Sequence, residues 1–300
     1  MEMVAWKEIE KVCEGVGFPQ EAVAELEKTY NRIMGKSAMQ FHSTAEGWVN
    51  PEADWRKCIW EISVIAKEAG VSLNAARMVL CLYCSIPLYQ EYPKRGLPES
   101  IYWETLQDLR YKLLECRAFY GEWGTFVPDW YRRFYICERF ALGRLQYEAV
   151  DFPGDSYKNV LKQGDRVYSC HIPSSGALRE EDVIESLKRA YNFYRSELKD
   201  GLLPVVCHSW LLYQPLNEVF AESPNIVKFR KMFDVVLNDE DANNGDFWRV
   251  FYKEFSVENL QSAPTETKLQ KRLKEYLLEG KTMGCGWGVL LFDGEKIINV

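Results

Sequence analysis

The sequence predicts an α+β protein in two parts, an all-α helical bundle over residues 1–125 followed by a mixed α/β domain over residues 126–300. Three observations lead to this fold class. Apolar residues recur every three or four positions through the first part, which is the period of helices with one buried face. Short runs rich in Val, Leu, Tyr and Cys flank a helical stretch in the second part. At 300 residues the chain also exceeds the usual size of one hydrophobic core.

Four helices can be read in the first part, and a bundle of four or five is expected there. The stretch from Pro51 to Ala69 places Trp, Ile and Ala on one face, and Gly70 ends it. Ser72 is placed to cap the next helix, which continues to about Tyr92. The other two expected helices are Pro19–Met34 and Glu99–Tyr120.

The boundary is expected at the segment GEWGTFVPDW, where two glycines and Pro128 interrupt the helical pattern. Beyond it, a helix separates the second and third expected strands, which predicts that these two strands are parallel neighbours. The sequence GCGWG at 284–288 is interpreted as a turn with close backbone packing. The expected strands are Arg139–Ala149, Arg166–Ile172, Leu203–Leu212 and Gly286–Phe292, and the expected helices are Leu178–Leu198 and Lys268–Glu279.

Charge argues against a nucleic-acid partner. The first 125 residues carry 14 Lys and Arg against 18 Asp and Glu, and the rest carry 23 against 26. Because phosphate contacts are made mainly by Lys and Arg, a nucleic-acid-binding protein shows a basic footprint. Neither part has one, so we expect no nucleic acid among the partners.

Hydropathy and cysteine content predict a cytoplasmic protein that has no membrane partner. The longest apolar run, Met78 to Cys84, is far shorter than a membrane-spanning helix needs, and the first residues do not have the layout of a signal peptide. The nine cysteines are irregularly spaced, so we expect reduced thiols and no metal centre.

A candidate anion site follows the second expected strand, where the chain passes through Pro-Ser-Ser-Gly into a helix. Free backbone N–H groups and the positive end of the helix dipole can hold a phosphate there. Gly176 allows the ligand to approach the main chain closely. Ordinary capping of the helix is the alternative role for the same residues.

This loop and several longer segments are similar to a known bacterial family. They resemble two-domain acyltransferases in which a helical N-acyltransferase N-terminal domain precedes a GNAT-like C-terminal domain, and Trp55 to Trp130 fits the helical part. The segments are RFALGRLQYE, YSCHIPSSGALREE, CHSWLLYQPLNEVF with SPNIVKF, and TKLQKRLKEYLLEGKTMGCGWGVLL.

The resemblance implies transfer of an acyl group from acyl-CoA, with acetyl-CoA as the expected donor, to a small-molecule amine. The usual loop of that superfamily has the pattern Gln/Arg-x-x-Gly-x-Gly/Ala, and the loop of this chain departs from it. A non-catalytic binding or scaffold protein with the same fold is therefore the alternative. The residues implied in holding the donor are Ile172, Ser174, Ser175, Gly176, Ala177, Leu178 and Arg179.

Candidate catalytic residues come from a feature that does not depend on the family, because Cys-His occurs in both central strands. Alternation places His171 and His208 on one face if the strands are parallel and in matching register, and either imidazole could accept the proton of an attacking amine. Glu148 is a further candidate base, and Tyr213 is a candidate acid for the departing thiolate. Structural roles remain the alternative for all four, and a metal or redox protein built on the Cys-His pairs is a third reading.

Overall fold

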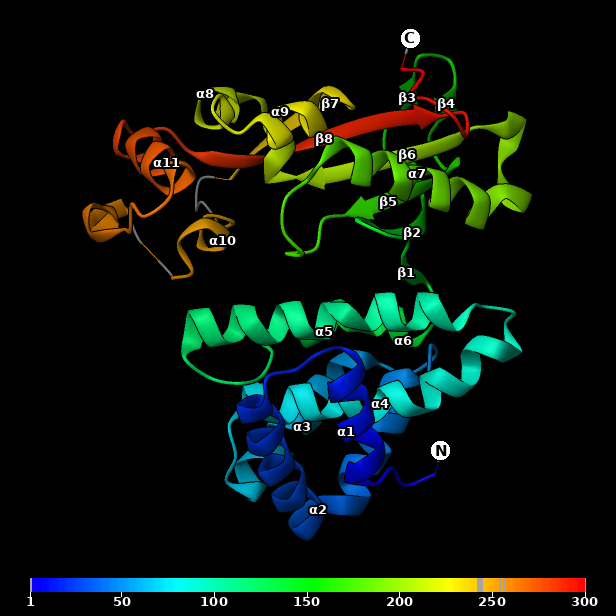
Figure 1. Cartoon of the computed structure of the whole chain (residues 1–300), viewed down its shortest axis with the longest axis vertical. Coiled ribbons are helices and arrows are strands. Elements are labelled where there is room, and N and C mark those ends of the chain that lie inside the picture. Colours follow the sequence, from blue (N-terminus) through cyan, green and yellow to red (C-terminus); the bar gives the residue numbers. More distant parts are fainter. Residues whose placement is uncertain (1, 242–244, 254, 256, 300) are drawn as a thin grey trace. The chain divides into compact units, whose positions relative to one another are not determined.

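A computed structural model describes residues 2–241, 245–253, 255 and 257–299. The chain divides into two units, Met1–Phe140 and Ala141–Val300 (Figure 1). The first is helical and the second is built on a mixed sheet, so the predicted fold class is confirmed. Residues 126–140, which the sequence assigned to the second part, pack with the first unit. Tyr135, for example, donates a hydrogen bond of 2.6 Å to the carbonyl oxygen of Cys81.

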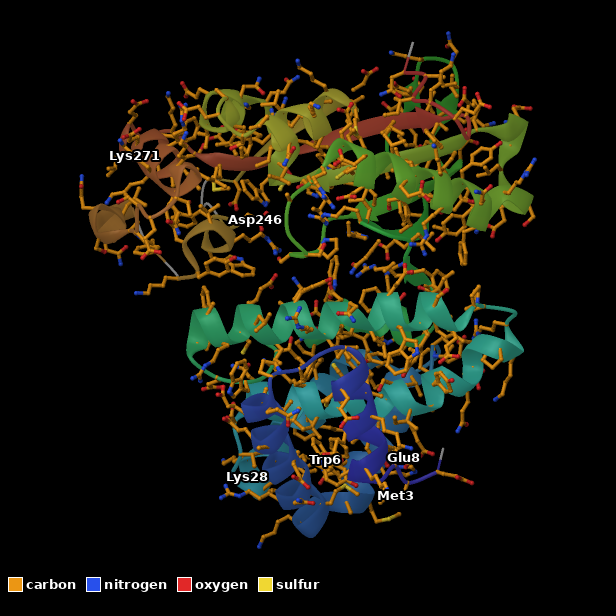
Figure 2. The ribbon with its side chains drawn as sticks, in the orientation of Figure 1. Met3, Trp6, Glu8, Lys28, Asp246 and Lys271 are labelled. Carbon is orange, nitrogen blue, oxygen red and sulfur yellow. The ribbon has the colours of Figure 1, made fainter. Side chains whose placement is uncertain are left out.

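Local sequence sets the ends of several helices in the first unit. The side chain of Asp54 accepts a hydrogen bond from a backbone N–H in the first turn of α3, and Ser72 does the same for α4. Trp6 of α1, labelled in Figure 2, lies with its ring 5.6 Å from that of Tyr30 on α2. The elements are α1 (Trp6–Gly15), α2 (Gln20–Val49), α3 (Trp55–Ala69), α4 (Leu73–Lys94), α5 (Glu99–Tyr120), the 3-10 turn η1 (Pro128–Tyr131) and α6 (Arg132–Tyr135).

The second helix is longer than its sequence pattern indicated. We expected it to end at Met34, but α2 continues to Val49 through a non-helical conformation at Ser37 (φ −138°, ψ 31°). The distortion shifts the buried face of the helix, which hides the continuation from a search for one regular period. Within the described residues, no single helix is long and apolar enough to cross a membrane, and only α3 and α4 taken together, bent by 118°, reach the required length and composition.

The second unit contains a six-stranded sheet in the order β1-β2-β5-β6-β8-β7. Strands β5 and β6 are parallel, as predicted, and α7 connects them. The strands are β1 (Arg139–Ala141), β2 (Gln146–Asp151), β5 (Arg166–His171), β6 (Leu203–Ser209), β7 (Asp234–Asp241) and β8 (Met283–Phe292), with a separate hairpin of β3 (Ser156–Tyr157) and β4 (Leu161–Lys162). The helices are α7 (Glu180–Tyr194), α8 (Asn217–Phe220), α9 (Pro224–Lys231), α10 (Trp248–Phe251) and α11 (Lys268–Leu278), with 3-10 turns η2 (Arg195–Glu197), η3 (Lys199–Gly201), η4 (Trp210–Leu212), η5 (Gln214–Leu216) and η6 (Val257–Ser262).

Three of the expected strands differ in detail. The strand expected over Leu203–Leu212 ends at Ser209, and Trp210–Leu212 form the 3-10 turn η4. The segment 139–149 is not one strand but two, β1 and β2, separated by a turn in which Leu142 donates to the carbonyl oxygen of Leu145 and Gly143 has φ 86°. The sequence GCGWG is not a turn but part of β8. Its glycines do pack closely, because a Cβ added at Gly286 would lie 2.4 Å from the carbonyl oxygen of Leu212.

The sheet has two distinct faces near the ends of β5 and β6. One face, here called the α7 face, packs against that helix, since Tyr147 of β2 lies 3.2 Å from Ser186 Oγ of α7. The opposite face, here called the imidazole face, carries Glu148 and His171. Elsewhere on the sheet a buried apolar cluster anchors the hairpin, formed by Phe152, Tyr157, Leu161, Val167, Val206, Val289 and Leu291.

Candidate functional site

The parallel strands β5 and β6 are hydrogen-bonded over only a short length. The last pair in their ladder is Ser169 with Val206, whereas the strands continue to His171 and Ser209. Beyond this pair the ladder between β5 and β6 does not continue. The loop with the predicted anion site begins directly after His171.

His171 is paired with a buried carboxylate. Its Nε2 lies 2.9 Å from Glu148 Oε1, and their side chains are 21% and 8% exposed. The antiparallel register of β2 and β5 causes this contact, since it sets Glu148 opposite Ser169, two residues from His171 on the same face. An ionised carboxylate can only accept, so a neutral imidazole in this contact donates from Nε2.

His208 lies on the same face as His171, as the predicted register required. It stacks on Trp287 of β8, with ring centroids 4.5 Å apart and planes 20° from parallel. His208 is an exposed residue, but partial desolvation lowers its pKa, while the carboxylates of Asp239 and Asp246 act in the opposite direction. The structure thus places both imidazoles on one face, and the contact with the buried Glu148 carboxylate is made by His171.

The predicted donor loop, residues 172–179, is held in place by hydrogen bonds from Arg144, which precedes it in the chain. The guanidinium of Arg144 donates three hydrogen bonds to loop carbonyls, at 3.1 Å to Pro173, 2.7 Å to Gly176 and 3.2 Å to Ala177. Residues 174–177 are exposed, and Gly176 has φ 103°, which favours glycine. The loop is therefore ordered by contacts within the protein and open to a ligand.

Cations offset the acidic first turn of α7. Arg179 Nε lies 2.7 Å from Asp182 and 3.8 Å from Glu181. Lys228 of α9 lies 2.8 Å from Glu180. The three carboxylates at this helix start are balanced by two cations here and by Arg144 at the loop, which lowers the repulsion that a bound phosphate would meet.

The remaining predicted donor residues are arranged around the exposed part of the loop. Leu178 is buried and anchors the start of α7, while Ile172 is half-buried where β5 ends. Ser174 and Ser175 are exposed, and the backbone N–H of Ser175 is used within the loop, donating to Pro173 at 2.8 Å.

Tyr213 is not on the imidazole face. It packs behind Gly284 of β8, on the side to which the glycines of that strand point. Burial raises the pKa of the Tyr213 phenol, so the group stays protonated at neutral pH. The thiols of Cys170 and Cys207 are buried on the α7 face, away from their neighbouring histidines. In the described parts of the chain, no three His, Cys, Asp or Glu side chains are arranged as metal ligands.

Two residues of this region were missed by the sequence analysis. Arg144 lies in the segment that was predicted to be one continuous strand, and such a strand gives no reason to expect that the arginine contacts the loop. Gly143 beside it was the available signal, because glycine inside a strand pattern often marks a turn. Trp287 was hidden within GCGWG, and its alternation with glycines was the sign of a strand with one tightly packed face.

Several solved structures share this fold. An acyltransferase in complex with decanoyl-CoA aligns with a TM-score of 0.63 at 21% identity, covering 94% of this chain and 98% of that one. A structure with decanoyl-CoA and teicoplanin aligns equally well at 19% identity over the same shares. A mutant acyltransferase with octanoyl-CoA aligns with a TM-score of 0.60 at 20% identity, covering 93% and 98%.

Family models match nearly the whole chain. The model of the N-acyltransferase N-terminal domain matches residues 7–137, and that of the GNAT-like C-terminal domain matches residues 140–290. No curated protein matches the sequence. The chain belongs to the acyltransferase family in which an N-acyltransferase N-terminal domain is followed by a GNAT-like C-terminal domain.

Proposed function

We propose that this protein transfers an acyl group from acyl-CoA to an amine of a small-molecule acceptor, with His171 as the general base. The observation that carries the proposal is the 2.9 Å contact between His171 and buried Glu148, immediately before the donor loop. A base that operates near neutral pH and is fixed in orientation by a carboxylate suits the removal of a proton from an attacking amine.

The donor is proposed to enter where β5 and β6 separate. Its pyrophosphate would lie on the exposed loop residues 174–177, at the start of α7. The pantetheine arm would lie along β5 and β6 beyond the Ser169–Val206 pair, where the ladder between the two strands ends. The thioester would then reach the sheet end that carries His171.

The chemistry needs few groups. The amine nitrogen attacks the thioester carbon, His171 Nδ1 accepts a proton from that nitrogen, and the carbon–sulfur bond breaks to release the CoA thiolate. Glu148 acts as a positioning residue, because its contact with Nε2 fixes the tautomer and stabilises the imidazolium that forms. Tyr213, the candidate acid from the sequence, packs on the other side of the sheet from His171, so we propose instead that the thiolate takes its proton from the His171 imidazolium or from water.

The departure of the loop from the usual superfamily pattern does not favour a scaffold role. Arg144 supplies from the preceding turn a cation that contacts three loop carbonyls. The similar solved structures contain decanoyl-CoA or octanoyl-CoA, so we propose a medium acyl chain as well as acetyl-CoA as donors to be tested. Teicoplanin, present in one of them, is a reasonable first acceptor.

The decisive experiment measures CoA release from acetyl-, octanoyl- and decanoyl-CoA with teicoplanin and a panel of simple amines. His171→Ala should lower kcat about 10²–10⁴-fold, the usual contribution of a general base, with little change in donor affinity. Glu148→Gln should give a smaller loss of kcat. His208→Ala is the matched control, because it removes an imidazole from the same face that has no carboxylate contact in the described structure.

The outcomes separate the alternatives. If His171→Ala is as active per folded molecule as the parent, His171 is not the base. If His208→Ala shows the large loss instead, the base is the other imidazole. Absence of binding to all three donors at millimolar concentration would contradict the enzyme and favour a scaffold.

A further inference from the structure

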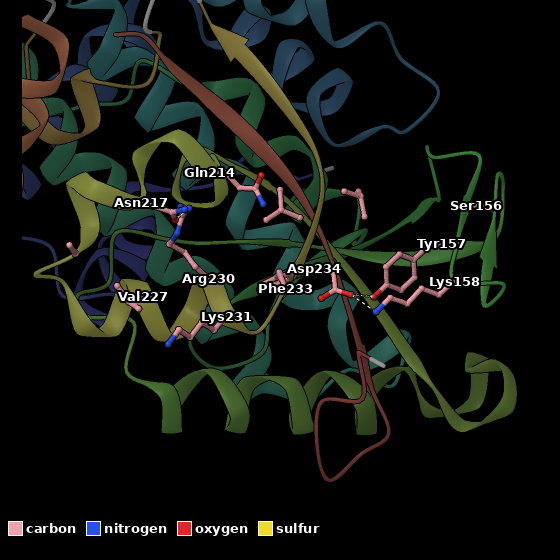
Figure 3. Close-up of a pocket in the computed structure, with 13 residues that line it drawn as sticks. Ser156, Tyr157, Lys158, Gln214, Asn217, Val227, Arg230, Lys231, Phe233 and Asp234 are labelled. Carbon is pink, nitrogen blue, oxygen red and sulfur yellow. Dashed lines mark hydrogen bonds and ion pairs between the residues drawn. The ribbon is translucent and has the colours of Figure 1, made fainter. Parts of the chain in front are cut away.

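A large pocket lies beside edge strand β7, separate from the donor loop (Figure 3). Its volume is about 930 Å³, which is within the usual size of a small-molecule site. It is bounded by the turn of the β3–β4 hairpin, by η5, α8 and α9, and by the first residues of β7. None of the residues that line it belongs to the donor loop or to the His171–Glu148 pair.

One wall of the pocket carries a half-buried guanidinium with neutral partners. Arg230 donates to the carbonyl oxygens of Leu211 and Tyr213 and to the side-chain oxygen of Asn217. In the part of the chain that the structure describes, no carboxylate forms an ion pair with it, and burial lowers the pKa of Arg230 to about 10. A desolvated cation of this kind is stabilised by an anion, which would offset the cost of burial.

The other charged groups of the pocket leave a positive excess. Lys158 and Asp234 neutralise each other at 2.6 Å, and Tyr157 also donates to Asp234, at 2.8 Å (Figure 3). Lys231 is exposed next to Arg230 and has no ion pair among the described residues. The pocket therefore carries about two uncompensated positive charges in a chain whose net charge is −7.

Apolar side chains also line the pocket. They are Phe233 just before β7, Val235 and Val236 at the start of β7, and Val227 of α9. Val236 is 52% exposed, and it lies at an irregularity in the pairing of β7 with β8, between Val235 and Leu237. A ligand with one charged end and one apolar end could thus contact both the cations and the apolar side chains.

We infer that this pocket binds a small amphipathic oxyanion, a carboxylate or phosphate attached to an apolar group. The oxyanion lies at Arg230 and Lys231, where the planar guanidinium suits carboxylate and phosphate oxygens. The apolar group lies against Phe233 and Val236. None of the residues that line this pocket belongs to the predicted donor loop or to the His171–Glu148 pair, so the two sites can be tested with separate variants.

Calorimetric titration of the whole protein tests this inference with benzoate and phenyl phosphate. Benzylammonium, which has the same ring and the opposite charge, and inorganic phosphate, which has no ring, are the ligand controls. Lys231→Glu and Val236→Asp alter a cation and an apolar side chain of the pocket at exposed positions, so neither should disturb folding. Lys271→Glu, at an exposed position on α11 (Figure 2), makes the same charge change elsewhere.

We expect at least one of the two aromatic anions to bind, and both ligand controls to bind more weakly. Lys231→Glu should weaken the affinity roughly fivefold, the effect of reversing one exposed charge near the ligand. Val236→Asp should weaken it as well, while Lys271→Glu leaves it unchanged. Arg144→Met, which removes contacts to the predicted donor loop and alters no residue that lines this pocket, should also leave the affinity unchanged. A failure of the proposed acyl transfer can thus be distinguished from a failure of this inference.

Three results would overturn the inference. The first is that neither aromatic anion binds at millimolar concentration. The second is that benzylammonium binds as well as benzoate. The third is that Lys231→Glu and Val236→Asp bind the anion with the same affinity as the parent. Arg230→Met is a further variant, but loss of its contacts to Leu211 and Tyr213 could unfold the region, so the two exposed variants carry the decision.

Discussion

Replacing Arg144 should weaken donor binding without changing the chemical step. Its guanidinium is half-buried and holds three loop carbonyls at 2.7–3.2 Å. A hydrogen bond in a protein contributes about 0.5–1.5 kcal/mol net, and the lower part of that range applies because two of the three are exposed to solvent. Together they contribute about 2 kcal/mol to the ordering of the loop, which corresponds to roughly a 30-fold change in affinity.

Arg144→Met should therefore raise the KM and the Kd for decanoyl-CoA by up to about 30-fold, with kcat nearly unchanged. Arg144→Lys keeps the charge but cannot span three carbonyls, so it should recover only part of the loss. Calorimetry with decanoyl-CoA measures Kd without any need for the acceptor, and CoA release measures KM and kcat. Arg166→Met, at the other end of β5, is the matched control.

The reasoning fails if Arg144→Met binds decanoyl-CoA as tightly as the parent does. It also fails if the variant loses kcat and keeps its KM, because a residue that only orders the donor loop acts on the bound ground state and the transition state equally. Melting temperatures of the unliganded variants identify any general loss of folding, and affinity is then compared per folded molecule.

Three further predictions concern stability and reactivity. Gly286→Ala should destabilise the protein by about 1–3 kcal/mol in urea unfolding, because the new Cβ would lie 2.4 Å from a backbone oxygen. Gly35→Ala in α2, where a Cβ has no atom within 4 Å, should stabilise it by about 0.5–1 kcal/mol. Equal effects of the two substitutions would contradict the packing argument. Partial desolvation lowers the pKa of His208, so the folded state binds fewer protons than the unfolded state and stability falls as pH drops through about 6.5. His208→Gln should lose less stability than the parent between about pH 7.5 and about pH 5.5, and an identical pH dependence would refute this. Burial raises the pKa of Cys285 to about 12, so iodoacetamide at about pH 8 should modify it far more slowly in the native protein than in urea, and equal rates would count against the structure there.

Features that depend on short stretches of chain could be predicted from the sequence. The helical unit followed from three- and four-residue periodicity, and Gly70 and Ser72 marked the helix ends seen in the structure. The β5–α7–β6 unit followed from the order of its elements, and the placement of both imidazoles on one face followed from alternation. Residues close together in the sequence determine these properties, so they can be predicted without knowledge of the fold.

Strand β7 could not be found in this way. It is an edge strand whose residues are mostly exposed, and its second half, Asn238–Asp241, is polar or acidic. An exposed edge needs no apolar alternation, so its sequence is that of a loop, and only pairing with β8 makes it a strand.

The candidate site likewise depended on contacts between distant residues. Local sequence supplied His171 and the glycine loop, but Glu148 became its partner through the antiparallel register of β2 and β5, 23 residues apart in the chain. Arg144 reached the loop from a turn about 30 residues earlier, at separations of 29 to 33. A side chain's hydrogen-bond partner is chosen by strand register and packing, and these are properties of the folded chain that no single segment contains.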